Sequence, residues 1–546
     1  MNPFEESRLA ITTGSRESFR VEPDVRPRPS VPTSNRRATV VYDVAILGAG
    51  LAGMATALRL QADGYRTVLI EAHGHAGGCS GYWSHRGYSF DVGATTLVDF
   101  EPGGVGGDLL DEVGVGPVEG ELLPGYLAWL PDREVRLHRE RERWHAERLR
   151  VFGDDPAHRA FWAHLDTVAD TFWSASRRGV RLPMRTPLDV LRNARAVGYH
   201  PLAVRHLPRT LADSMRRHGI SADRPLRGLL SMMVEDTVHT TVEDAPLINA
   251  ALGITIRGAG LTRHTGGMRG FWRRLVARYR ALGGDLRVAT VAQAVSGRPG
   301  EYVVATSRGE HHAVQVVSAL PAETTSRIFG GLVAQRLSSY LQRDERSYGG
   351  AVVLFLGVPD AEVADQEFTH HQFMHSYDRP LGSGNNMFVS VSAAGDRVSA
   401  PEGRRAVMIS THVELDDWRG LSESDHHLAK KRIGEELLTQ ARRAYPGLGD
   451  NADVLSVATP RAFARFAGRP DGAVGGVRQS PANSNRRAIP HHLGIRGVHL
   501  VGDSVWPGVG TVACVLGSRI VADNVRADAR RLRRRRHDVP AVTSPV

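Results

Sequence analysis

The sequence predicts an α/β protein of two domains, one of which is inserted into the other. A chain of 546 residues exceeds what one hydrophobic core usually supports, so we expect two cores. Buried-strand and helix patterns alternate near both ends of the chain, whereas amphipathic helical stretches and further strand-like runs fill the middle. With 41% hydrophobic and 23% charged residues, the composition is typical of a globular protein.

The N-terminal segment does not belong to either predicted domain. Residues 1–38 are rich in Pro, Arg and Ser and have no apolar periodicity, so we expect them to be disordered. Met1–Thr39 lacks the basic-then-apolar order of a signal peptide, and no apolar run reaches the ~18 to 20 residues of a membrane span. We therefore expect a cytoplasmic location, and leave peripheral contact with a membrane surface open.

A strand–helix–strand unit follows directly. Val40–Gly50 is a continuous apolar strand ending in glycines, Leu51–Gly64 has helical spacing and a glycine stop, and Tyr65–Ala72 is a second buried strand. The turn reads GAGLAG, and its glycines permit a tight turn, close approach of the backbone to a pyrophosphate, and close helix packing. These glycines are Gly48, Gly50 and Gly53.

An acidic residue completes this pattern. Glu71 ends the second strand at the spacing where an acid accepts hydrogen bonds from an adenosine ribose. The N–H groups at the helix N-terminus would face the phosphates. Together these features predict a dinucleotide site, and we assign to it the neighbours Ala49, Leu51, Ala52 and Ala72 as well.

Changes in pattern divide the rest of the chain between the two domains. The dinucleotide-binding domain is expected in three segments, namely 39–120, 261–330 and 481–525. The inserted domain is expected to be mainly helical and membrane-facing over 121–260 and to carry a mixed sheet over 331–480. Strand-like runs predict that sheet, namely Ala351–Val358, Met387–Ala393 and Ala406–Val413.

The charge pattern does not indicate nucleic acid. The net charge of +10 lies largely at the two chain ends and in arginine-rich segments, and residues 526–546 are expected to form a basic tail. Zinc-finger spacing and aromatic-interleaved basic strands are absent from the sequence. Because Cys79 and Cys514 are the only cysteines, neither a disulfide framework nor a cysteine metal site is expected, and we assign no metal ligands.

Two further stretches decide which dinucleotide binds. Gly77 and Gly78 form a second glycine pair beyond Glu71, and VGDSVWPGVGTVACVLGSR (501–519) combines a strand end, a Gly-Asp pair and a turn into a helix. The arrangement resembles the FAD-dependent amine oxidase and phytoene desaturase superfamily, in which a glutamate, a Gly-Gly pair and a C-terminal Gly-Asp strand enclose FAD. The resemblance covers Val41 to Asp523 and implies FAD as the cofactor.

The finer resemblance is to the carotenoid desaturase and isomerase branch of that superfamily. Four motifs stand in that branch's order, namely GYSFDVGATTL (87–97), HTGGMRGFWRRL (264–275), GGDLRVATVAQAV (283–295) and LVGDSVWPGVGT (500–511). The implied fold is a Rossmann-like FAD-binding domain of the amine-oxidase (GR2) type, with an inserted α+β substrate domain that carries a mixed sheet and helices.

The resemblance also implies further cofactor contacts. The backbone of Val291 and Ala292 would lie on the adenine, while Gly502 would approach the phosphates and Asp503 would hydrogen-bond the ribityl chain. The flavin ring would be bordered by Gly93, Ala94 and Thr95 on one side. The helix from about Thr511 would direct its N-terminus at the flavin N1–C2=O edge, and this end of it includes Gly510, Thr511 and Val512.

The activity implied is that of an FAD-dependent oxidoreductase that desaturates or isomerises a long hydrophobic polyene such as a carotenoid. Desaturation delivers a hydride to flavin N5 and a proton to a base or to water. Because the sequence has no second complete dinucleotide fingerprint, oxygen or a quinone is the expected electron acceptor. No catalytic side chain is assigned, and His264 and Trp506 are the candidates, the first for its titratable imidazole and the second for its place in the last turn.

Two other functions stay open. A flavin oxidase or isomerase could tailor a different hydrophobic or amine-bearing metabolite on the same scaffold. A non-catalytic escort protein for lipids or prenylated partners is the alternative from outside enzymes.

Overall fold

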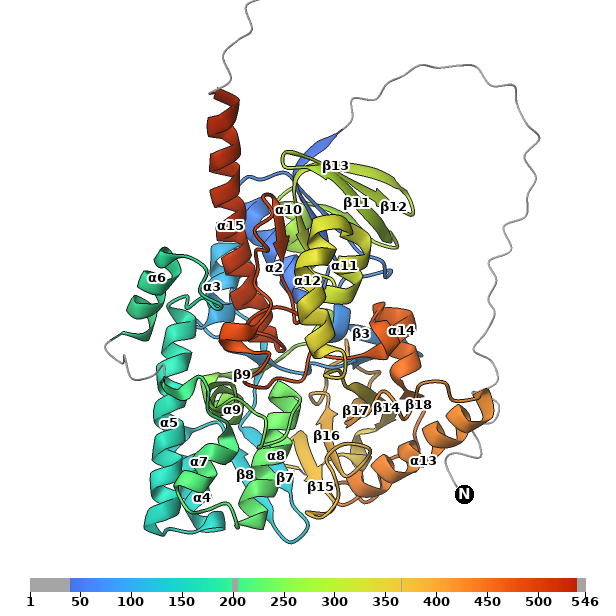
Figure 1. Ribbon diagram of the computed structural model, residues 1–546. Coiled ribbons are helices and arrows are strands. Elements are labelled where there is room, and N and C mark those ends of the chain that lie inside the picture. The colour runs from blue at the N-terminus through green and yellow to red at the C-terminus, as the bar shows by residue number, and fades with distance from the viewer. Residues whose placement is uncertain (1–39, 199–204, 365, 538–546) are drawn as a thin grey trace, which may run out of the picture.

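The computed structural model describes residues 40–198, 205–364 and 366–537, which fold around two large sheets (Figure 1). The disorder expected for residues 1–38 therefore lies outside the described residues. The helices are α2 (Leu51–Ala62), α3 (Val105–Glu112), α4 (Arg141–Phe152), α5 (Pro156–Arg177), α6 (Pro187–Val197), α7 (Leu211–Arg217), α8 (Arg224–Val238), α9 (Leu247–Ile254), α10 (Gly267–Ala281), α11 (Ala322–Phe329), α12 (Gly331–Asp344), α13 (Glu423–Ala441), α14 (Pro460–Ala467) and α15 (Thr511–His537).

The strands come from the whole length of the described chain. They are β1 (Val41–Leu47), β2 (Thr67–Ile70), β3 (Tyr82–His85), β4 (Tyr88–Asp91), β5 (Leu97–Val98), β6 (Gly120–Leu122), β7 (Gly125–Trp129), β8 (Glu134–His138), β9 (Leu261–His264), β10 (Asp285–Arg287), β11 (Ala292–Arg298), β12 (Glu301–Thr306), β13 (Gly309–Ser318), β14 (Gly350–Pro359), β15 (His370–Met374), β16 (Asn386–Val391), β17 (Arg404–Val413), β18 (Val454–Ala458) and β19 (Val498–Leu500).

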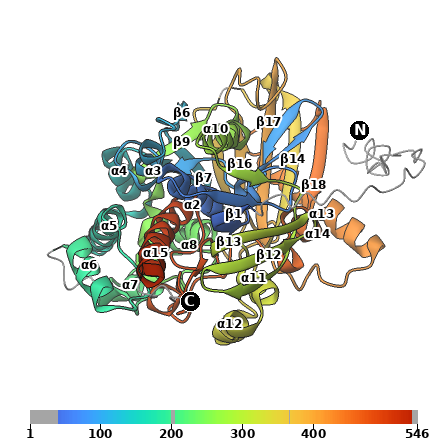
Figure 2. The same cartoon turned by 90° about the horizontal axis from the view of Figure 1, so that it is seen from above.

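The first large sheet has the order β10-β2-β1-β13-β12-β11, with β19 also paired to β13. β10, β2, β1, β13 and β19 run parallel, whereas β11, β12 and β13 pair antiparallel. Val44 and Ile46 of β1 pack on one face with α2, α10 and α15, and Ala45 and Leu47 pack on the other with α11 and α12 (Figure 2). Because both faces are buried over residues 44–47, this part of β1 is a continuous apolar run, as the sequence predicts.

The second large sheet has the order β18-β14-β17-β16-β15-β7-β8. Its strand pairs are antiparallel except β15 with β7, so the sheet is mixed as expected, and β14, β16 and β17 confirm the three predicted strand runs. α13 covers one face, and β7 packs with the cluster of α5, α8 and α9 on the other.

Two strands of this sheet come from the segment that we expected to be mainly helical. Val135 and Leu137 are buried while Glu134 and Arg136 are exposed, which is the period of two that a half-buried strand requires. The many arginines of this segment made it look like an exposed helix in the sequence, so the alternation of β8 was not recognised.

The C-terminal helix does not end where we expected a tail to begin. α15 continues through residue 526 to His537. Arg526 Nε donates a hydrogen bond to Asp63 over 2.6 Å, and the buried Asp528 accepts one from Gly497 N over 3.0 Å. The first part of the basic segment is thus a helix docked on the first domain. Among the described residues, no helix is both long enough and apolar enough to cross a membrane.

Candidate functional site

A cavity of about 1350 Å³ joins the two domains. One end is lined by the glycine turns of the first large sheet, and the other by α5, α8, α9 and strands of the second large sheet. Sites for one small ligand usually enclose about 300–1000 Å³. The cavity therefore has room for a dinucleotide together with a second molecule.

The two glycine motifs meet at the dinucleotide end. Gly77 N donates a hydrogen bond to the carbonyl oxygen of Ala49 over 3.0 Å, so the second motif crosses directly over the first. A Cβ atom on Gly53 would lie 2.0 Å from the carbonyl oxygen of Gly48, which explains why the helix needs glycine there. This close packing is the role that the fingerprint predicts.

The geometry of the first turn fits a pyrophosphate. A Cβ atom on Gly50 would meet no atom closer than Gly78 Cα at 3.9 Å, so the backbone there is open toward the cavity. Gly50 is also the N-cap of α2, and no side chain caps that helix end. Without a side-chain cap, the first turn of α2 can bind an anion through its N–H groups, where the helix dipole favours negative charge.

Glu71 lies beside this turn with both carboxylate oxygens engaged. Oε2 accepts a hydrogen bond from Ala49 N over 2.7 Å, and Oε1 accepts one from His73 N over 2.8 Å. Burial raises the pKa of Glu71, and the two backbone N–H groups oppose that shift. Each oxygen keeps a second lone pair, so the carboxylate can still accept bonds from a ribose hydroxyl.

The other residues that the sequence assigns to the cofactor also converge here. Ala49 is fully buried behind the turn. The remaining assigned residues line the cavity, namely Gly48, Gly50, Leu51, Ala52, Gly53, Glu71, Ala72, Gly77, Gly78, Gly93, Ala94, Thr95, Val291, Ala292, Gly502, Asp503, Gly510, Thr511 and Val512. Their individual contacts with FAD stay predictions.

Asp503 has a partner that the sequence did not reveal. Its carboxylate pairs with the guanidinium of Arg469, with Nη1 of the arginine 3.3 Å from Oδ1, and both side chains are largely buried. Burial alone would lower the pKa of Arg469, but Asp503 raises it above its ordinary value. Arg469 follows α14 in a stretch without a recognisable motif, so only the folded chain brings it to the site.

Trp506 lies on the cavity wall in the last turn and is nearly buried. Its Nε1 donates to Asn485 Oδ1 over 3.4 Å, and Asn485 in turn donates to Asn249 of α9 over 2.8 Å. Gln479 Nε2 donates to the carbonyl oxygen of Pro507 over 3.2 Å. The turn is thus held by the amide side chains of Gln479 and Asn485, and Asn485 links it to Asn249 of α9.

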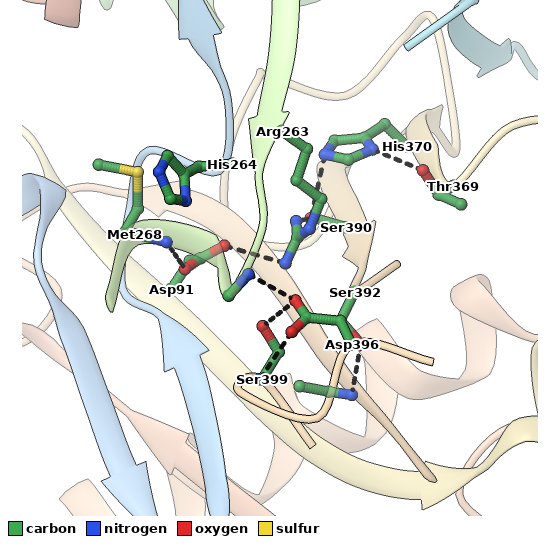
Figure 3. A network of polar contacts seen from close by, with 12 residues as sticks. Asp91, Arg263, His264, Met268, Thr369, His370, Ser390, Ser392, Asp396 and Ser399 are labelled. Atoms are coloured by element: carbon green, nitrogen blue, oxygen red, sulfur yellow. Dashed lines mark hydrogen bonds and ion pairs between the residues drawn. The ribbon is translucent and has the colours of Figure 1, made fainter. Parts of the chain in front are cut away.

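His264 is not brought to the cavity. It ends β9 inside a buried network in which Arg263 Nη2 lies 3.2 Å from Asp91 Oδ2 (Figure 3). Arg263 also donates to Ser390 of β16 over 3.0 Å, so the network joins the two domains. Burial lowers the pKa of His264, and its Nδ1 bonds the neighbouring Thr265 carbonyl. Its place in the structure indicates a packing role.

The far part of the cavity is mostly apolar. Its wall includes Phe172, Trp173, Leu182, Ile248, Leu252, Ile256, Val353, Phe355 and Phe388. Three ionisable side chains that the sequence analysis missed also face it, namely Asp236, His239 and His412. Asp236 and His239 lie at the end of α8 and His412 lies on β17, so no local spacing joins all three.

One cluster of the described residues has the composition of a metal site. His492, His499 and Asp528 bring their ligand atoms within 4.8 Å of one another. His499 Nε2 is 3.0 Å from Gln315 Oε1, and Asp528 binds Gly497 N, so the cluster is already hydrogen-bonded. The absence of a metal stays a prediction.

Comparisons with known proteins agree with this site. Residues 46–113 match a family model described as an NAD(P)-binding Rossmann-like domain, and residues 130–526 match that of the flavin containing amine oxidoreductases. Prolycopene isomerase 1 (chloroplastic) of an Oncidium hybrid cultivar is 24% identical over 513 residues, which cover 89% of this chain and 84% of that protein. The 4,4'-diapophytoene desaturase (4,4'-diaponeurosporene-forming) of Staphylococcus aureus (strain COL) is 20% identical over 523 residues. The match covers 89% of this chain and 99% of that protein.

A solved structure shares the fold. Cyclohexylamine oxidase from Brevibacterium oxydans superposes with a TM-score of 0.57 at 14% identity, over 90% of this chain and 100% of that one. The comparisons confirm the resemblance stated for the sequence, and FAD is the cofactor. The chain is an FAD-dependent oxidoreductase, and it belongs to the flavin containing amine oxidoreductase family.

Proposed function

We propose that this oxidoreductase desaturates or isomerises a long hydrophobic polyene such as a carotenoid. One observation carries the proposal: a single cavity is lined both by the glycine turns that fit FAD and by the apolar side chains of α5, α9 and β14. A long apolar molecule in the far part would therefore reach the cofactor without crossing water. The carotenoid-related names of the two curated relatives support the same class of substrate.

The chain's own residues have three tasks in this reaction. The turns at Gly50 and Gly78 would hold the pyrophosphate, and Glu71 would hold the adenosine ribose, since all three line the cavity. The apolar wall orients the polyene and excludes water, which fixes the geometry of the reacting bond. The N-terminus of α15 lines the cavity and would stabilise negative charge. Bound FAD supplies the hydride acceptor.

Membrane contact is part of the proposal, and α6 is the element that we propose to make it. Met184, Leu188, Val190 and Leu191 are exposed on or next to this helix, at the outer edge of the protein (Figure 1). Beside them lies a pocket of about 370 Å³ whose wall includes five arginines, namely Arg178, Arg181, Arg192, Arg195 and Arg519. Apolar side chains beside cations match an anionic lipid surface.

The position of α6 also suggests where the substrate enters. Trp173, Ser176, Val180 and Leu182, just before α6 in the chain, line the main cavity. A polyene leaving the bilayer at α6 would thus arrive at the apolar end of the cavity. We propose oxygen or a membrane quinone as the final electron acceptor, which the rate of flavin reoxidation by each would test.

The test is anaerobic mixing of the purified, FAD-loaded protein with an acyclic carotene in detergent. We expect the visible flavin absorbance to bleach and the carotene to gain a double bond, or an isomer to appear without net bleaching. If the carotene is unchanged while an amine-bearing or other metabolite bleaches the flavin, the enzyme tailors that metabolite. Flavin that no candidate reduces, with no product formed, would favour the escort function.

A further inference from the structure

The pocket beside α6 is separate from the main cavity and is strongly basic. Its volume of about 370 Å³ is near the lower limit of sites for small ligands. Asp523 is the single carboxylate among the described residues that line it. All other charged residues on its wall are arginines, and we call this site the arginine pocket; they are Arg178, Arg181, Arg192, Arg195 and Arg519. Positive charge therefore exceeds negative charge on this wall.

The carboxylate of Asp523 is already shared between two arginines. Arg181 Nη2 donates to its Oδ2, and Arg526 Nη1 donates to its Oδ1 over 2.8 Å. Arg181 is largely buried, with 13% of its side chain exposed. Both oxygens of Asp523 are thus occupied, so this carboxylate does not neutralise the other arginines of the pocket.

Three of those arginines have no acidic partner. Within the described ranges, no carboxylate forms an ion pair with Arg178, Arg192 or Arg195. Because the guanidinium group stays protonated in proteins, each of the three carries a full positive charge. Like charges gathered in one pocket repel one another, and a bound anion would remove that repulsion.

Hydrogen bonds within the protein hold the arginine pocket in shape. The buried Asn193 of α6 accepts a hydrogen bond from Arg181 N over 2.8 Å and donates one to Arg181 O over 2.6 Å. Arg519 Nη2 of α15 donates to Ser176 O, near the end of α5, over 2.9 Å. The pocket is therefore built where α5, α6 and α15 meet, and these contacts form it before any ligand binds.

The arginine pocket and the main cavity share one short segment of chain. Arg178, Gly179 and Arg181 line the pocket, whereas Val180 and Leu182 line the apolar end of the main cavity. A ligand in the pocket would therefore be separated from a substrate in the cavity by this one segment.

Apolar side chains accompany the arginines on α6. Leu188 precedes Arg192 by four residues, and Leu191 precedes Arg195 by four, so each leucine lies one turn from an arginine on the same side of the helix. All four residues are exposed. This face of α6 thus offers cations and apolar side chains together, which matches a molecule with an anionic head and apolar chains.

We propose that the arginine pocket binds the terminal phosphate of a lipid headgroup, as in phosphatidic acid, and so holds one anionic lipid beside the apolar end of the substrate cavity. A phosphate monoester has three acceptor oxygens and carries about −1.5 to −2 charge at neutral pH. Guanidinium groups bind such oxygens in pairs. A phosphodiester headgroup has a single charge and satisfies fewer arginines. The inference deepens the proposed membrane contact of α6 and rests on it.

The test compares two kinds of phosphatidylcholine vesicle, which contain either phosphatidic acid or phosphatidylglycerol and are adjusted to the same zeta potential. Binding of the full-length, FAD-loaded protein is measured by co-sedimentation. We expect the vesicles with phosphatidic acid to bind about tenfold more tightly, because the monoester forms at least one more hydrogen bond between charged groups. Equal binding to the two would mean that surface charge alone attracts the protein, and would overturn the inference.

Substitutions locate the preference in the pocket. Arg192→Gln with Arg195→Gln is expected to abolish the preference for phosphatidic acid, and the fold should be kept because both side chains are exposed. The matched control is Arg336→Gln with Arg432→Gln, which removes the same charge from exposed positions on α12 and α13 and should keep the preference. A pocket variant that keeps the full preference would overturn the inference.

A soluble ligand separates the two sources of phosphate and the two proposals. Glycerol 3-phosphate should displace the protein from vesicles with phosphatidic acid. If it binds while neither kind of vesicle does, the pocket takes a free phosphate ester, and both the lipid assignment and the membrane contact are wrong. If both vesicles bind equally and binding needs Leu188 and Leu191, the membrane contact stands and the pocket inference is wrong. Conversion of a polyene is measured separately, so failure of that function is recognised independently.

Discussion

The guanidinium of Arg469 forms an ion pair with the carboxylate of Asp503, with Nη1 at 3.3 Å from Oδ1, on the wall of the cofactor cavity. Asp503 is the residue that the family resemblance assigns to the ribityl chain. The pair is largely buried, so neither charge is well solvated without the other. Arg469 therefore holds the carboxylate of Asp503 in position at this wall.

Loss of Arg469 should destabilise the protein. Arg469→Gln leaves Asp503 as a buried unpaired charge, and we expect a loss of about 3–5 kcal/mol in the free energy of unfolding. The double variant Arg469→Gln, Asp503→Asn should recover a large part of that loss. Chemical denaturation of the four proteins in the cycle measures the coupling, and independent, additive effects would contradict a functional pair.

A substitution at Gly50, in the first glycine turn, tests cofactor binding without disturbing the fold. Gly50→Ala adds a methyl group that meets no protein atom closer than 3.9 Å, so the apoprotein should fold normally. The same methyl group would occupy the space of the pyrophosphate, and we expect FAD affinity to fall about a hundredfold. The control is Gly74→Ala, where nothing lies within 4 Å of the added Cβ. Titration followed by flavin fluorescence measures the FAD affinity of both variants. Equal FAD affinities of Gly50→Ala and Gly74→Ala would mean that the phosphates do not bind at Gly50.

The sequence predicted the parts of the site that local geometry dictates. The fingerprint, Glu71 and the last turn are each fixed by a strand-to-helix connection or a strand end, and a short motif records that geometry. Arg469, Asp236 and His412 are different, because each acts through a partner brought close only by the tertiary fold. For the same reason His264 was a misleading candidate, since its position next to a glycine motif does not tell which way β9 faces.

Membrane contact through α6 predicts a loss of vesicle binding when its apolar side chains are removed. We expect Leu188→Ser with Leu191→Ser to weaken binding to phosphatidylglycerol vesicles about tenfold or more, because each leucine buries apolar area in the bilayer. Leu428→Ser is the matched control, since Leu428 is 63% exposed on α13. Co-sedimentation measures the binding. Equal binding of the double variant and the control would exclude α6 as the docking element.

The buried histidines predict a loss of stability at mildly acidic pH. Burial lowers the pKa of His499 to about 3 and that of His491 to about 4. Their folded pKa values lie below the unfolded value near 6.5, so the unfolded chain binds more protons between these limits, and stability falls as the pH drops below 6.5.

A substitution identifies the contribution of His499. Replacing it by Asn should reduce the slope of unfolding free energy against pH, by about 0.7 kcal/mol per pH unit at pH 6.5 and by about 1.4 kcal/mol per pH unit near pH 5. Urea denaturation at several pH values between neutrality and pH 5 measures the slope. An unchanged slope would mean that His499 is not a buried neutral group.

Product analysis from cells that make defined acyclic polyenes, with and without this chain, tests the proposed function most directly. We predict that the intact chain converts a polyene to a more unsaturated or isomerised product, and that the Gly50→Ala variant does not. Unchanged polyenes in the presence of an FAD-loaded protein, together with a change in an unrelated metabolite, would contradict the polyene assignment.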